Sequence, residues 1–174
     1  MDLESRAVEI LERAGIEEGQ IVLDFGCGSG TYTIPAAKIV GDKGSVYALD
    51  KDSNVLNELM QRAKSAGLNN IEPMHTHGEL TIDLADNSVD VVLLFDVLHS
   101  YYFPLADDRR RLLDEVHRIS KAGALISVYP KHIESMVKDE IEGANFCLLS
   151  EYSARLIHDN TDVIEGQILI FTKK

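Results

Sequence analysis

Three glycines at alternate positions, Gly26, Gly28 and Gly30, directly follow the short apolar run 21–25. Glycine has no Cβ, so its backbone can turn tightly and let a ligand approach closely. A helix is expected from about Ser29, and the free N–H groups at its start favour an anionic group. This pattern predicts a loop that binds a small molecule at the end of a buried strand.

A carboxylate, Asp50, ends the second apolar run, 46–49, and stands 20 residues after Gly30. At that place a carboxylate can accept hydrogen bonds from both hydroxyls of a ribose. The loop lacks the Gly-Lys-Ser/Thr of a triphosphate loop, and Thr31 stands where a dinucleotide fingerprint has its third glycine. The glycines together with Asp50 predict an adenosine-type cofactor. The alternative is a tight turn beside a solvated strand end.

The elements that position these residues alternate between strands and helices. Apolar periodicity predicts helices at about 3–14, 29–40, 53–66, 107–120 and 133–141, and strands at 21–25, 46–49, 71–75, 89–95 and 124–129. Such alternation is typical of a parallel sheet with right-handed crossovers. Two further strands are expected at 146–149, with an extension toward 157 left open, and at 167–172, with a turn at 159–160. Without a helix between them, they are expected to form an antiparallel hairpin.

Length and charge narrow the classes of function. The 174 residues predict one domain over 1–174, in which 1–20 form a short helix and lead-in. With 17 basic and 29 acidic residues the formal net charge is −12, which disfavours nucleic-acid binding and anionic membrane surfaces. No apolar run approaches the ~18–20 residues of a membrane span, and the first residues do not resemble a secretory signal.

The cysteines and histidines do not form a metal-binding pattern. Cys27 and Cys147 are far apart and outside any Cys-x-x-Cys pair, so neither a disulfide framework nor a zinc site is expected. His75 and His77 would share one face of a strand, but they lack nearby thiols or a His-Glu-x-x-His pattern. We therefore predict no metal, and the cysteine usage favours a reduced, cytoplasmic setting.

The segment 22–30, VLDFGCGSG, resembles the first motif of class I S-adenosylmethionine-dependent methyltransferases, especially the small-molecule group that includes the ubiquinone/menaquinone C-methylases. Asp50 matches the acid of their second motif. Residues 83–99 resemble the stretch around their fourth strand, and 120–124 the turn before the fifth. The resemblance implies an α/β fold, a Rossmann-like three-layer sandwich whose seven-stranded, mostly parallel sheet has an antiparallel last strand.

The resemblance also implies S-adenosylmethionine as cofactor, with S-adenosylhomocysteine as product. Asp24 would lie near the cofactor's ammonium group, Asp50 would hold its ribose, and Lys51 would follow against its adenine. Phe95 and Asp96 would border the sulfonium side. The implied cofactor-binding set is Asp24, Gly26, Cys27, Gly28, Gly30, Asp50, Lys51, Gly78, Glu79, Phe95 and Asp96.

Three positions depart from the family pattern. Gly78 stands where the family often has an aspartate that binds the adenine amino group, and Glu79 is the candidate substitute. Lys51 replaces a residue that is commonly apolar, although its stem can still pack on a ring. Only about 20 residues precede the first strand, which leaves little chain for the lid helices of many relatives.

The implied reaction is in-line methyl transfer to an unidentified, small-molecule acceptor. A base is needed only where the acceptor loses a proton. Residues that follow the fourth and fifth strands are candidates to touch the acceptor, with His99 first; the others are Tyr101, His132, Tyr102 and Tyr129. For each of them the alternative is a packed or solvated side chain.

Two other functions stay open. A non-catalytic module that binds the cofactor or a partner is suggested by the short lead-in. An NAD-dependent oxidoreductase rests on fold alone, and the glycine spacing opposes it. A homo-oligomer is also left open.

Overall fold

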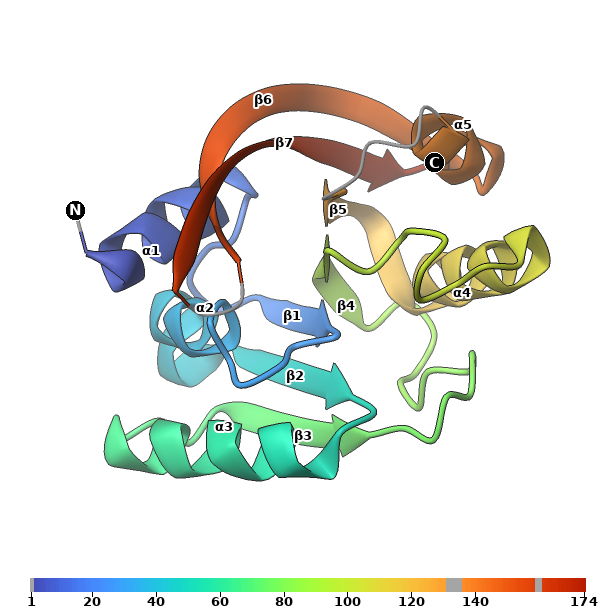
Figure 1. The fold of residues 1–174 in the computed structure, drawn as a ribbon. Helices are drawn as coiled ribbons and strands as arrows, with labels where there is room; N and C mark the ends of the chain where they lie inside the picture. Colours follow the sequence, from blue (N-terminus) through green and yellow to red (C-terminus); the bar gives the residue numbers. More distant parts are fainter. Residues whose placement is uncertain (1, 131–135, 159–160) are drawn as a thin grey trace.

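A computed structural model describes residues 2–130, 136–158 and 161–174. Its strands form one seven-stranded sheet in the order β3-β2-β1-β4-β5-β7-β6 (Figure 1). Neighbours among β1–β5 are parallel, and β7 is antiparallel to both β5 and β6. The strands are β1 Ile21–Phe25, β2 Ser45–Asp50, β3 Ile71–His75, β4 Val89–Phe95, β5 Ser120–Tyr129, β6 Phe146–His158 and β7 Asp162–Lys173. The predicted sheet, with its antiparallel last strand, is confirmed.

Helices cover both faces of the sheet. They are α1 Leu3–Arg13, α2 Thr33–Val40, α3 Ser53–Ser65, α4 Ala106–Ile119 and α5 Met136–Gly143, with a short 3₁₀ turn, η1, at Gly41–Lys43. Apolar residues of α1, α2 and α3 pack in one core against one face. Those of α4 and α5 pack in a second core against the other face. The three-layer sandwich is therefore confirmed. Among the described helices, none combines the length and apolarity needed to cross a membrane.

Helix α3 shows how the sequence sets an element's ends. The side chain of Asp52 caps its first turn by accepting the N–H of Asn54 at 2.8 Å. Leu56, Leu59 and Ala63 recur at helical spacing and are buried. The cap starts the helix just after β2, and the apolar stripe packs the helix against the sheet. The chain thus returns along the sheet before β3, which pairs in parallel with β2.

Several predicted boundaries were wrong. Helix α2 begins at Thr33 rather than near 29, because Gly28 and Gly30 have φ values of 54° and 93° that no helix contains. Strand β5 begins at Ser120 rather than 124, with a register irregularity opposite β4. Strand β6 runs through the extension that was left open, to His158, and β7 begins at Asp162 rather than 167. The predicted turn at 159–160 and the start of the predicted helix at 133 lie outside the described residues.

The hairpin of β6 and β7 is the longest pairing in the molecule. It runs from Phe146 opposite Lys173 to His158 opposite Asp162, and it bends strongly (orange and red in Figure 1). The hydroxyl of Tyr32 accepts the N–H of Ile157 at 2.9 Å and donates to its carbonyl oxygen at 3.3 Å. The end of the hairpin is therefore attached to the segment that follows the glycine loop.

Candidate functional site

The three glycines of the loop after β1 all adopt positive φ: 74° at Gly26, 54° at Gly28 and 93° at Gly30. Side chains rarely tolerate this backbone region, so glycine is required there. A Cβ on Gly30 would lie 2.2 Å from Cδ1 of Leu59, whereas one on Gly28 would meet no atom within 4 Å. Gly30 therefore serves close packing, and Gly28 faces open space.

Asp50 at the end of β2 is joined directly to the glycine loop. Its Oδ2 accepts the N–H of Gly28 at 2.9 Å, and its Oδ1 accepts the N–H of Asp52 at 3.0 Å. The N–H of Gly26 also donates to the carbonyl oxygen of Leu49 at 2.8 Å. The two sequence features are therefore adjacent in space, and the carboxylate is held in a fixed orientation.

Asp24, in the middle of the same region, is a buried carboxylate with 4% of its surface exposed. Its Oδ2 accepts the hydroxyl of Thr33 at 2.6 Å. Burial raises the pKa of Asp24 to about 6, the nearby charge of Asp50 adds to the rise, and the hydrogen bond from Thr33 opposes it. A cationic group placed beside Asp24 would relieve the cost of burying this charge. This buried carboxylate thus fits a ligand that carries an ammonium or sulfonium group.

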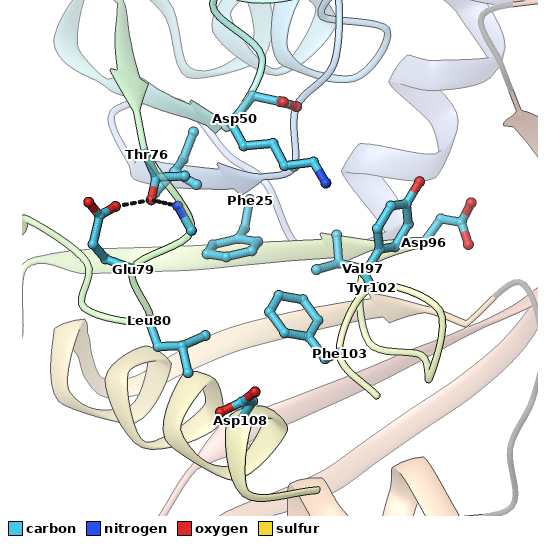
Figure 2. Close-up of a pocket in the computed structure, with 14 residues that line it drawn as sticks. Phe25, Asp50, Thr76, Glu79, Leu80, Asp96, Val97, Tyr102, Phe103 and Asp108 are labelled. Carbon is cyan, nitrogen blue, oxygen red and sulfur yellow. Dashed lines mark hydrogen bonds between the residues drawn. The ribbon is translucent and has the colours of Figure 1, made fainter. Parts of the chain in front are cut away.

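A cavity of about 490 Å³ opens at the carboxyl ends of β1, β2 and β4 (Figure 2). Its apolar wall includes Phe25, Val97 and Phe103, which suits a flat ring. Of the predicted cofactor-binding residues, those that line it are Gly26, Asp50, Lys51, Gly78, Glu79 and Asp96. The others, which lie outside its lining, are Asp24, Cys27, Gly28, Gly30 and Phe95.

The side chain of Glu79 is hydrogen-bonded within its own loop. Its Oε2 accepts the hydroxyl of Thr76, as Figure 2 shows, and also the N–H of His77, each at 2.7 Å. These hydrogen bonds, that of Thr76 foremost, lower the pKa of Glu79 to about 2. Gly78 between them has a φ of 98° and donates its N–H to the Thr76 hydroxyl at 3.2 Å. A role for Gly78 or Glu79 toward adenine stays a prediction.

Lys51 and Tyr102 face each other across the cavity. The Nζ atom of Lys51 lies 5.6 Å from the centroid of the Tyr102 ring. The carbonyl oxygen of Lys51 lies 3.1 Å from Nε2 of His75. Among the described residues that line the cavity, Lys51 is the one with a cationic side chain.

At the other end of the cavity, Asp96 follows β4 with a φ of 58°. Its N–H donates to the carbonyl oxygen of Tyr129 at 2.7 Å. Its Oδ1 lies 3.5 Å from Nε2 of His99, and its Oδ2 lies 3.4 Å from Nε2 of His158. His158 was not among the predicted site residues, and no local signal points to it, because the long hairpin brings it here.

The residues predicted to touch the acceptor differ in how far they are exposed to solvent. His99 is 7% exposed, and Tyr101 is 82% exposed. The ring of Tyr102 lies 4.6 Å from that of His99, between centroids. Tyr129 is buried, and burial together with the charge of Asp96 raises its pKa to about 12. His132 lies outside the described residues.

Among the described residues, no three His, Cys, Asp or Glu side chains lie together in a way that could hold a metal ion. His75 and His77 stack edge to face with 4.6 Å between centroids. Cys27 is buried, and burial raises the pKa of its thiol. This cysteine is therefore a packed residue rather than an activated nucleophile.

Comparisons with known proteins agree with this geometry. Residues 22–123 match the model of a family described as a methyltransferase domain. The demethylmenaquinone methyltransferase of Geobacillus stearothermophilus is 32% identical over 117 residues, which are 67% of this chain and 47% of that protein. The chain thus spans about half the length of the curated relatives it matches.

Solved structures show the same fold. A SAM-dependent methyltransferase from Aquifex aeolicus superposes with a TM-score of 0.78 at 24% identity, over 95% of this chain and 88% of that one. TYW2 of M. jannaschii, solved in complex with AdoMet, superposes with a TM-score of 0.68 at 20% identity, over 97% and 76%.

The fold and the site define a Rossmann-like domain with a glycine loop joined to a strand-end carboxylate. The family model covers more than half of the chain. The chain belongs to the class I S-adenosylmethionine-dependent methyltransferases. S-adenosylmethionine is the cofactor of that family.

Proposed function

We propose that this chain binds S-adenosylmethionine and transfers its methyl group to a small-molecule acceptor. The observation that carries the proposal is the carboxylate of Asp50, which is fixed to the N–H of Gly28 beside a cavity that opens at the strand ends. The family match supports it, and a relative named for a quinone supports a small-molecule acceptor.

The cofactor-binding roles are proposals for the residues that the motifs predicted. Asp50 would receive the ribose hydroxyls, and Asp24 would lie near the ammonium group. Phe25, which the motifs did not single out, offers an aromatic surface within the cavity. The rest of the proposed set is Gly26, Cys27, Gly28, Gly30, Lys51, Gly78, Glu79, Phe95 and Asp96.

The cofactor supplies an electrophilic methyl group on a sulfonium, which is a good leaving group. The protein then has to align the acceptor and exclude water, and alignment alone can supply much of the acceleration. The carboxylates around the cavity favour a cationic ligand. Tyr102 and Phe103 at its apolar side would limit the access of water.

The test is a calorimetric titration with S-adenosylhomocysteine, with NADH titrated alongside. Micromolar binding of S-adenosylhomocysteine and none of NADH is the expected result, followed by methyl transfer from labelled S-adenosylmethionine. A folded protein, free of copurified cofactor, that ignores millimolar S-adenosylhomocysteine would contradict the proposal and favour a partner-binding module. Binding without turnover on any acceptor would favour the non-catalytic alternative.

The cellular setting is proposed from composition. Neither cysteine forms a disulfide within the described ranges, which fits a reduced, cytoplasmic protein. The net charge of −12 disfavours a nucleic-acid partner. A homo-oligomer stays open, and size-exclusion chromatography with light scattering would decide it.

A further inference from the structure

Asp96 is held in a costly state at the edge of the cavity. Its φ of 58° lies in the left-handed region, which side chains other than those of Asn and Asp rarely adopt. Its Oδ1 is buried and accepts no hydrogen bond from any residue the structure describes. Strained backbone and an unsatisfied buried oxygen both tend to mark functional positions. Asp96 is among the residues that line the cavity, and a quarter of its side chain is exposed.

His99 is oriented as a donor toward this carboxylate. The N–H of Tyr101 donates to Nδ1 of His99 at 3.1 Å, so Nδ1 acts as an acceptor. In the neutral imidazole, the proton is then assigned to Nε2, which lies 3.5 Å from Oδ1 of Asp96. With Nδ1 engaged and Nε2 protonated, this geometry favours His99 as a residue that orients Asp96 rather than as the base.

His158 approaches the carboxylate from the opposite end of the chain. Its Nε2 lies 3.4 Å from Oδ2 of Asp96, while the neighbouring Ile157 is bonded to the hydroxyl of Tyr32. Two imidazoles, one from the loop after β4 and one from the hairpin, therefore flank one carboxylate. Burial, together with the nearby charge of Asp96, raises the pKa of Tyr129 to about 12, which disfavours this phenol as the base.

The charges around the cavity restrict the acceptor. Asp50, Glu79, Asp96 and Asp108 line it, with Lys51 as the cation among the described lining residues. An anionic acceptor would be repelled, and an already ionised one would gain nothing from a base. An uncharged acceptor that bears a hydroxyl fits both the charge and the aromatic wall.

We propose that, within the methyltransferase function proposed above, Asp96 accepts the proton of an uncharged hydroxyl acceptor, and that His99 and His158 are positioning residues for its carboxylate. The acceptor's O–H bond breaks, and the proton passes to Asp96. The oxygen's electron pair forms the bond to the methyl carbon as the methyl–sulfur bond breaks, and sulfur keeps that electron pair in S-adenosylhomocysteine. Asp96 then returns the proton to solvent, to which a quarter of its side chain is exposed.

The first experiment compares two phenols of different acidity as methyl acceptors. Asp96→Asn keeps the shape of the side chain and tolerates the left-handed backbone. With 4-methoxyphenol, which needs a base, the variant should lose about 100-fold or more in rate. With 4-nitrophenol, whose hydroxyl is far more acidic and needs less help from a base, the loss should be small, about threefold. Asp42→Asn on the exposed turn η1 is the matched control and should match the parent on both phenols.

The second experiment reads the positioning residues without turnover. Nitrogen-15 NMR should find the proton of His99 on Nε2, and Asp96→Asn should shift that resonance. His158→Gln, which keeps a donor, should retain most of the rate with 4-methoxyphenol, whereas His158→Leu should lose it. Affinity for S-adenosylhomocysteine should stay within about threefold of the parent in both His158 variants.

Four results would overturn the proposal. They are a proton on Nδ1 of His99, an unimpaired Asp96→Asn on 4-methoxyphenol, an unimpaired His158→Leu on the same phenol, and no methylation of either phenol by a parent protein that binds S-adenosylhomocysteine. A parent protein that fails to bind S-adenosylhomocysteine would instead refute the proposed function itself.

Discussion

The first four strands and the final hairpin build opposite sides of the site in different ways. Strands β1–β4 are parallel, 5 to 7 residues long, and place polar groups in the loops just after them. The hairpin strands have 13 and 12 residues, and β6 brings His158 back to the end of β4. The family model covers 22–123 and stops before the hairpin. The proposed cofactor side is thus built from a local motif, and the proposed acceptor side includes a residue of the distant hairpin.

The contacts differ in the same way. On the cofactor side, Gly28 and Asp50 are 22 residues apart, with one crossover between them. On the hairpin side, Tyr32 and Ile157 are 125 residues apart. We therefore expect variants to affect the two sides separately.

The largest expected effect separates packing from binding within the glycine loop. Gly30→Ala would place Cβ 2.2 Å from Leu59 at a φ of 93°, so the free energy of unfolding should fall by about 2–4 kcal/mol. Gly28→Ala meets open space and should lose only roughly 1–2 kcal/mol, from backbone strain. Urea unfolding measures both stability losses. Calorimetry should show that Gly28→Ala, despite its smaller stability loss, weakens the binding of S-adenosylhomocysteine. Equal stability losses would show that the contact with Leu59 is unimportant.

The buried charge of Asp24 should lower the free energy of unfolding while it strengthens cofactor binding. Its pKa is about 6 in the native state, against 3.8 for an unperturbed aspartate, so between these values the native state binds more protons than the unfolded state. The free energy of unfolding therefore falls as pH rises from about 4 to 6, by up to about 3 kcal/mol.

Asp24→Asn removes that loss and keeps an acceptor for the hydroxyl of Thr33. Without ligand it should exceed the parent's free energy of unfolding by up to about 3 kcal/mol at pH 7.5 and match it at pH 4. It should also bind S-adenosylhomocysteine more weakly. Denaturant unfolding at the two pH values tests this, with the exposed Asp83→Asn as control. A gain that does not depend on pH would show that the charge is not its source.

Neighbouring carboxylates after β2 should separate binding from folding. Asp50→Ala removes the acceptor of the Gly28 N–H and should weaken S-adenosylhomocysteine by about 1.5–3 kcal/mol. Asp52→Ala removes only the cap of α3, so it should lower stability by about 1 kcal/mol and leave affinity unchanged. Calorimetry and thermal unfolding of both variants make the comparison. An unchanged affinity in Asp50→Ala would remove Asp50 from the site.

The parts that the sequence predicted are those with local physical causes. Positive φ at the glycines, the cap at Asp52 and the apolar runs of β1–β4 each depend on neighbouring residues, so the order of elements and the cofactor loop could be predicted. The full length of the hairpin could not, because residues 149–155 of β6 are exposed or half-buried and carry little apolar signal. The strained Asp96 and the approach of His158 depend on pairings across the whole chain.

The smallest expected effect tests whether the hairpin is a separate unit. Tyr32→Phe removes the hydroxyl that binds the N–H and carbonyl oxygen of Ile157, so the free energy of unfolding should fall by roughly 1–2 kcal/mol. Hydrogen exchange should quicken at the amides of 156–158 and stay unchanged in β1–β4. Tyr101→Phe, on an exposed side chain, should alter neither quantity. Faster exchange throughout β1–β4 would mean that both sides of the site open together, and the acceptor side could then not vary independently.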